Sequence, residues 1–190
     1  MRVLIIDESP ERIAVLRDGL EGAGYEVAAA FTSPLELLRA VEETKPDVII
    51  IDTESPSRDV LEHVVLITRD QPRPIVMFSS DDAPETIRKA VRAGVSAYVV
   101  DGLDAARVKS IVEVAVARFG EYQRLRAELA EATLKLSERK LVERAKGLLM
   151  KARGMDEDEA FQAMRRMAMD RGKRLVEIAR QVIDVAKLLG

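Results

Sequence analysis

The chain has 190 residues, a formal net charge of −3 and no cysteine, which excludes disulfides, thiolate zinc sites, iron–sulfur clusters and cysteine nucleophiles. Its 47% hydrophobic and 33% charged residues fit a globular protein and argue against a disordered, collagen-like or membrane-embedded chain. The first apolar stretch stops at Asp7, too soon for a signal peptide, and no run reaches the roughly 20 apolar residues of a membrane helix, so we expect a cytoplasmic protein.

Short apolar runs alternate with amphipathic segments over the first hundred residues. The runs predict five strands, at residues 3–7, 25–31, 47–52, 74–80 and 96–101. Apolar side chains at helical spacing predict helices between them, at residues 11–20, 34–41, 58–69 and 84–93. The first, third and fourth strands are rich in Val and Ile, as expected for strands covered on both faces. This order predicts a doubly wound α/β domain with a parallel five-stranded sheet.

A long helix is predicted next, from Asp104 to about Leu136. This stretch has no proline and a single glycine, and its apolar residues from Val108 onward recur at alternating steps of three and four. Such heptad-like spacing favours pairing with a second copy of the chain. The alternative is packing against the chain's own sheet, which we expect for residues 108–116. We therefore predict a homodimer in which a coiled-coil linker, residues 121–136, joins domains at residues 1–120 and 137–190.

The last part of the chain predicts three helices, at residues 137–152, 156–169 and 175–189. Gly154 suits a helix C-terminus, and Asp156 with Glu159 matches a capping box. These 54 residues carry 13 Lys and Arg against 9 Asp and Glu, whereas residues 1–136 carry 17 against 24. A basic end on an acidic body is the composition expected for contact with a polyanion.

Acidic side chains recur where the predicted strands end. Asp7 and Glu8 follow the first strand, Asp52 ends the third, and Asp101 follows the fifth. A single Asp at such a place is usually a turn or helix cap. Several are expected to meet at one edge of a parallel sheet, where they repel each other unless a hard cation such as Mg²⁺ neutralises them. We therefore expect Mg²⁺ at Asp7, Glu8 and Asp52.

These acids, together with Ser79 after the fourth strand and Tyr98 in the fifth, resemble a response-regulator receiver domain with the CheY-like fold. The resemblance covers residues 1 to about 120. It implies that Asp52 accepts phosphate, that Asp7 and Glu8 help to hold Mg²⁺, and that the Ser79 hydroxyl contacts the phosphoryl group.

The sequence departs from the receiver pattern at Asp101, where the family has a lysine. Two unit charges 4 Å apart interact by about 4 kcal/mol at an effective dielectric near 20, and this interaction with a phosphoryl group is attractive for Lys and repulsive for Asp. We therefore expect phosphorylation of Asp52 to be weak or not the main signal. The receiver domain would then serve chiefly for docking and dimerisation.

Residues 144–175, RAKGLLMKARGMDEDEAFQAMRRMAMDRGKRL, resemble the ANTAR module of RNA-binding transcription antiterminators. The resemblance implies dimeric binding to paired RNA hairpins, which prevents a terminator from forming. Basic side chains offer charges for phosphates and Arg planes for stacking on bases. The candidate RNA-binding residues are Lys146, Gly147, Lys151, Arg153, Arg165, Arg166, Lys173 and Arg174. The alternatives are a solvated helix face for the basic residues and a tight helix–helix crossing for Gly147.

Over its full length the chain is similar to nitrate-assimilation antiterminators of the NasT type, at DVIIIDTESPSRDVLEHVV, RDQPRPIVMFSS and GVSAYVVDG. This similarity implies control of nitrate and nitrite assimilation genes through leader-RNA hairpins. It also implies a nitrate-sensor protein that sequesters the regulator until nitrate or nitrite binds.

Two other classes compete with this interpretation. Three basic helices could instead place one helix in the major groove of DNA, as the output of a phosphorylation-dependent regulator. An enzyme has little support, because His63 is the only histidine and the sequence has no phosphate-cradling glycine loop or nucleophile elbow. We therefore expect no catalytic residues.

Overall fold

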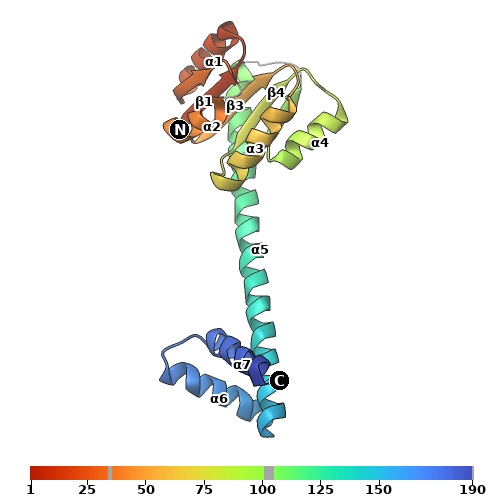
Figure 1. Ribbon diagram of the computed structural model, residues 1–190. Helices are drawn as coiled ribbons and strands as arrows, with labels where there is room; N and C mark the ends of the chain where they lie inside the picture. The colour runs from red at the N-terminus through yellow and green to blue at the C-terminus, as the bar shows by residue number, and fades with distance from the viewer. Residues whose placement is uncertain (34–35, 101–104, 190) are drawn as a thin grey trace. The chain divides into compact units, whose positions relative to one another are not determined.

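The computed structural model describes residues 1–33, 36–100 and 105–189. The chain divides into two compact units, residues Met1–Gln123 and Arg124–Gly190 (Figure 1). None of the helices in these described ranges is long and apolar enough to cross a membrane.

The first unit is built on a parallel sheet, which confirms the predicted α/β class. Its strands are β1 (Arg2–Asp7), β2 (Glu26–Phe31), β3 (Val48–Thr53), β4 (Ile75–Ser79) and β5 (Ala97–Val100). Their order is β2-β1-β3-β4-β5, and every neighbouring pair is parallel. The predicted strands agree with these within a residue or two at each end. The register pairs Asp7 with Asp52 and Thr53 with Ser79, so the ends of three central strands lie side by side.

Helices cover both faces of this sheet. They are α1 (Pro10–Gly22), α2 (Leu37–Thr44), α3 (Arg58–Asp70), α4 (Pro84–Ala93) and the start of α5 (Ala105–Arg153). Successive residues of a strand point to opposite faces. Accordingly, Leu4 and Ile6 pack with α2, α3 and α4, whereas Val3 and Ile5 pack with α1 and α5. The sheet is therefore doubly wound, as predicted.

Helix α2 differs most from its prediction in the first unit. It extends to Thr44, three residues beyond the expected end at Val41, and stops where Lys45 adopts a left-handed φ of 45°. Residues 34 and 35, where we expected it to begin, lie outside the described residues.

Helix α5 is continuous over 49 residues, so the predicted break between residues 136 and 137 is wrong. No glycine or proline lies near residue 137 to interrupt the backbone hydrogen bonds, so the helix continues through it. The helix ends before Gly154, which has a left-handed φ of 66°. Val108 and Val112 are buried against the sheet, which confirms the packing expected for residues 108–116.

The second unit consists of the end of α5 together with α6 (Glu157–Asp170) and α7 (Leu175–Leu189). The predicted capping box is present: the Asp156 carboxylate accepts from the Glu159 backbone N–H at 2.7 Å, and the Glu159 carboxylate accepts from the Asp156 N–H at 3.0 Å. The three helices enclose a small core of Ala145, Met164, Ala168, Ile178, Ala179 and Ile183.

Candidate functional site

The carboxylates of Asp7 and Asp52 lie together at the edge of the sheet, as the sequence predicted. Asp7 ends β1 and Asp52 lies one residue before the end of β3, and the two residues are partners in the strand register. Asp7 is fully buried, and the side chain of Asp52 is only 12% exposed. Two carboxylates this close, one fully buried and one partly buried, need a positive charge to offset their repulsion.

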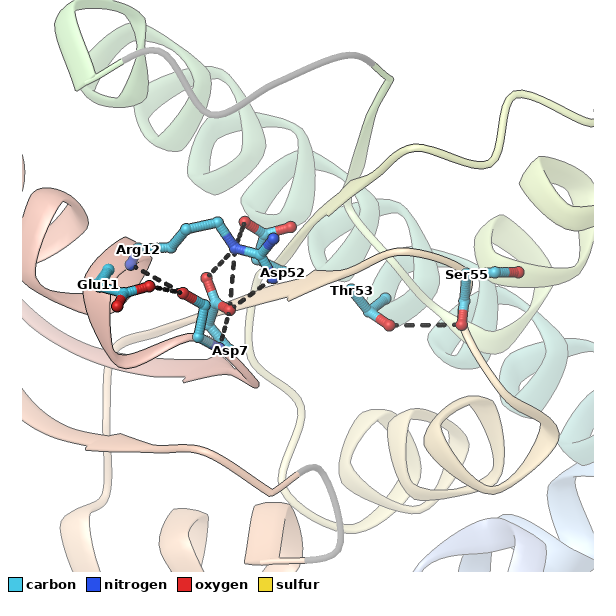
Figure 2. Close-up of polar contacts among 7 residues, drawn as sticks. Asp7, Glu11, Arg12, Asp52, Thr53 and Ser55 are labelled. Atoms are coloured by element: carbon cyan, nitrogen blue, oxygen red, sulfur yellow. Dashed lines mark hydrogen bonds and ion pairs between the residues drawn. The ribbon is translucent and has the colours of Figure 1, made fainter.

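Arg12 provides that charge. Its Nε lies 3.1 Å from both Oδ1 and Oδ2 of Asp7, and its Nη2 donates to Oδ1 at 2.9 Å. The same Nε lies 3.4 Å from Asp52 Oδ2, so one guanidinium contacts both carboxylates (Figure 2).

The β1–α1 turn places Arg12 at this point. The Ser9 backbone N–H donates to Asp7 Oδ1 at 2.8 Å, and the Ser9 hydroxyl accepts from the Arg12 backbone N–H at 3.3 Å as the N-cap of α1. Sequence reasoning missed Arg12. The available signal was an arginine in the first turn of the helix that directly follows the acidic residues.

Asp52 has a perturbed protonation equilibrium. Burial, and next the negative charge of Asp7, raise its pKa from 3.8 to about 6, while Arg12 opposes the shift. The hydrogen bond to Asp7 is the main cause that raises the pKa of Arg12. The folded protein therefore disfavours the ionised form of the Asp52 carboxylate.

The predicted switch residues Ser79 and Tyr98 form hydrogen bonds to the loops that follow β3 and β4. The Ser79 hydroxyl donates to the Glu54 carbonyl at 2.9 Å and accepts from the Asp81 N–H at 3.1 Å. The Tyr98 hydroxyl donates to the Asp81 carbonyl at 2.8 Å. Ser79 also lines a cavity of about 330 Å³ together with Arg12 and Asp52. Asp101, the third predicted switch residue, lies outside the described residues.

In the second unit, the candidate RNA-binding residue Lys146 lies between two glutamates. It is buried, and its Nζ lies 2.7 Å from Glu157 Oε1 and 2.9 Å from Glu143 Oε2. Hydrogen bonds to Glu143 and Glu157 raise the pKa of Lys146. Its charge is neutralised within the unit and connects α5 to the start of α6, so the predicted contact of Lys146 with RNA would require these ion pairs to break.

The other predicted basic residues are exposed. Arg174 forms an ion pair with Glu138, its Nη2 lying 2.6 Å from Oε1. The remaining five form no ion pair with any residue that the structure describes: Lys151, Arg153, Arg165, Arg166 and Lys173. Arg153 and Arg166 line one groove of about 870 Å³, in which the end of α5, α6 and α7 meet.

Gly147 is not explained by a tight helix crossing. A Cβ added there would meet no atom of the described residues within 4 Å, so an alanine would fit the fold at this position. The alternative in which Gly147 permits close packing of two helices of the unit is therefore contradicted.

Two protein families match this chain, one in each unit. The response regulator receiver domain family matches residues 3–113, and the ANTAR domain family matches residues 124–183. The transcriptional regulatory protein PdtaR of Mycobacterium tuberculosis is 34% identical over 183 residues, which cover 96% of this chain and 89% of PdtaR. This chain is an ANTAR-domain response regulator.

Other relatives of this ANTAR response regulator match one part of it. The nitrate regulatory protein of Klebsiella oxytoca is 50% identical over 68 residues, which cover 36% of this chain and 17% of that protein. A protein-glutamate methylesterase of Halobacterium salinarum is 32% identical over 102 residues, 52% of this chain and 29% of the relative. The signal receiver domain of a modulated diguanylate cyclase from Desulfovibrio desulfuricans has the same fold, with a TM-score of 0.56 at 24% identity over 64% of this chain and 97% of that domain.

Receiver domains commonly bind Mg²⁺ at acidic residues. Mg²⁺ requires near-octahedral oxygen ligands about 2.0–2.1 Å away. Here the oxygens of Asp7 are engaged by Arg12 and Ser9, and Glu8 is exposed. Within residues 1–33, 36–100 and 105–189, no group of three or more His, Asp or Glu could hold a metal ion. The Asp7 oxygens that Mg²⁺ would need are engaged by Arg12 and Ser9, so the side chains of this ANTAR response regulator do not fit Mg²⁺ while Arg12 stays in place.

Proposed function

We propose that this ANTAR response regulator is a transcription antiterminator that binds leader-RNA hairpins and controls nitrate and nitrite assimilation genes. The observation that carries the proposal is a set of five exposed basic residues that form no ion pair with any described residue, in a unit that matches the ANTAR family: Lys151, Arg153, Arg165, Arg166 and Lys173. Unpaired cations can exchange their counterions for RNA phosphates, whereas paired ones such as Lys146 would first have to break an ion pair.

The RNA test compares these arginines with a paired arginine of equal charge. Arg153→Ala and Arg166→Ala should each weaken hairpin binding and lower the salt dependence of log Kd by about one unit. Arg88→Ala is the control, because Arg88 is exposed in α4 but paired with Glu85 at 2.9 Å. Equal affinities for all four proteins would contradict the assignment of the RNA surface.

The same assay with duplex DNA at matched salt separates RNA from DNA recognition. Both polyanions attract the basic unit, but only the proper target should stay bound as ionic strength rises. Tighter binding to duplex DNA than to hairpin RNA at high salt would replace the antiterminator proposal with a DNA-binding output.

We also propose that the regulator acts as a homodimer through α5. Tyr122, Leu125, Leu129, Ala132 and Leu136 follow alternating steps of three and four, and the four large residues of this set are each more than half exposed. Leu129→Lys should therefore shift the sedimentation coefficient toward that of a monomer. Leu134→Lys is the matched control, because Leu134 is also exposed but lies off this spacing.

A partner sensor, and not phosphorylation of Asp52, would control the regulator. The Nitrate regulatory protein relative supports a nitrate-linked partner, and the engaged Asp7 carboxylate supports weak phosphorylation. A small-molecule phosphodonor with Mg²⁺ should modify Asp52 slowly and leave RNA affinity unchanged. Rapid, stoichiometric modification that alters RNA binding would overturn this part, whereas nitrate-dependent release from a co-purified sensor would support it.

A further inference from the structure

The acidic pocket of the receiver unit, formed by Asp7 and Asp52, already contains a positive charge, the guanidinium of Arg12. Asp7 Oδ1 accepts from the Ser9 N–H and from Nε and Nη2 of Arg12, while Asp7 Oδ2 accepts from Nε. The guanidinium is the only one of these donors that carries a charge, and it cannot be deprotonated in a protein. The fully buried Asp7 carboxylate is thus compensated by a permanent charge of the chain itself.

Arg12 also occupies the position between the two carboxylates. Its Nε contacts Asp52 Oδ2 at 3.4 Å as well as both oxygens of Asp7, and Figure 2 shows the guanidinium between the ends of β1 and β3. A divalent cation bridging Asp7 and Asp52 would need those same oxygens, at shorter distances. Arg12 and the cation therefore compete for one place.

The arginine is positioned by local backbone structure. The Asp7 carboxylate holds the Ser9 amide, and the Ser9 hydroxyl holds the Arg12 amide, so the side chain starts from a fixed first turn of α1. Its own side chain is 44% exposed, and water can reach one side of it. Displacement of Arg12 is therefore sterically allowed but must break its contacts with Asp7.

We propose that Arg12 is a built-in counter-ion that takes the place of a divalent cation in the acidic pocket. With Arg12 present, the ends of β1 and β3 lie side by side without metal, and Mg²⁺ binds only by displacing the guanidinium. The proposal concerns the receiver unit alone and does not depend on RNA binding.

The test is a calorimetric titration of the full chain with MgCl₂. The wild-type protein should bind Mg²⁺ weakly, and Arg12→Ala and Arg12→Gln should each bind it at least about tenfold more tightly, because removing the cation leaves two uncompensated carboxylates. Arg17→Ala is the matched control, since Arg17 lies on the same helix and pairs with Glu21 at 3.9 Å, away from the pocket. Its affinity should equal that of the wild type.

The melting temperature supplies a second test, which does not require a measured Mg²⁺ affinity. In EDTA, both Arg12 variants should melt below the wild type, and Mg²⁺ should restore their melting temperature while leaving that of the wild type unchanged.

Submillimolar Mg²⁺ binding by the wild type, or equal affinities in wild type and Arg12 variants, would overturn the proposal. The wild-type titration decides even if a variant fails to fold. Neither measurement involves RNA, so failure of the Arg12 proposal would leave the antiterminator proposal intact. Failure of the antiterminator proposal would likewise leave the Arg12 proposal intact.

Discussion

Each compact unit holds a cluster of three charged side chains, and the two clusters bury opposite signs. In residues 1–123 the anion Asp7 is fully buried, and the cation Arg12 that contacts it is 44% exposed. In residues 124–190 the cation Lys146 is buried, and its two glutamate partners are more than half exposed. The buried member decides what a substitution does, because a buried charge left without its partner is far more costly than an exposed one.

The largest loss of stability is therefore expected for Arg12→Ala. The change leaves Asp7 buried and uncompensated beside Asp52, and should lower the free energy of unfolding by about 2 kcal/mol, less than a fully buried pair because solvent screens Arg12. Urea denaturation in EDTA, followed by circular dichroism, measures it. Arg17→Ala should lose no more than about 0.5 kcal/mol, and an equal loss in both variants would show that the pocket does not need the guanidinium.

A stabilising effect is expected for Asp52→Asn. Its folded pKa of about 6 lies above the ordinary value of 3.8, so the fold disfavours the ionised form. Protonated Asp52 contributes its full stabilisation of the fold below pH 3.8, and this contribution is lost as the pH rises through about 6. At neutral pH the neutral Asn should therefore gain about 1–2 kcal/mol, after a discount for partial exposure. Unfolding curves at pH 4 and pH 7 test this, and a gain that is equal at both pH values would contradict it.

Smaller effects are expected in the second unit. Lys146→Met removes the buried charge itself and leaves two exposed glutamates, so its melting temperature should fall less than that of Arg12→Ala. The paired variant Glu143→Gln with Glu157→Gln leaves the buried ammonium without a carboxylate and should melt below Lys146→Met. Melting curves of the full chain distinguish the two, and the reverse order would show that the glutamates, not Lys146, need compensation.

The smallest effect is expected on the RNA affinity of the Lys146→Met variant. Because Lys146 is engaged internally, Lys146→Met should bind hairpin RNA as the wild type does, provided that the unit stays folded. Filter binding measures this beside Arg166→Ala. A loss in Lys146→Met as large as that in Arg166→Ala, without a change in melting temperature, would return Lys146 to the RNA surface.

The sequence predicts the sheet and the meeting of Asp7 with Asp52 well, because both follow from local pattern and simple topology. Runs of Val and Ile mark strands that are covered on both faces, and parallel strands end at one edge. The continuity of α5 through Ser137 is harder to predict, because serine is tolerated within a helix as well as outside one.

The partners of charged side chains are much harder to predict. Arg12 lies five residues from Asp7, yet its reach to Asp52 depends on where α1 sits beside β3. Lys146 follows Glu143 by three residues, which hinted at a helical ion pair, but its burial depends on Glu157 at the start of another helix. Such contacts come from tertiary packing, which periodicity does not contain.

The middle of α5 has a consequence for backbone hydrogen exchange. Between residues 124 and 137 every side chain is exposed, and support comes from ion pairs along the helix, Arg124 with Glu128 and Glu131 with Lys135, each worth a few tenths of a kcal/mol. Helices usually open from their ends, but here both ends are packed and the centre is not. Amide protons near Leu129 should therefore exchange with deuterium sooner than those near Val112 or Ala145. In the proposed homodimer, a second α5 would cover these amides and slow their exchange.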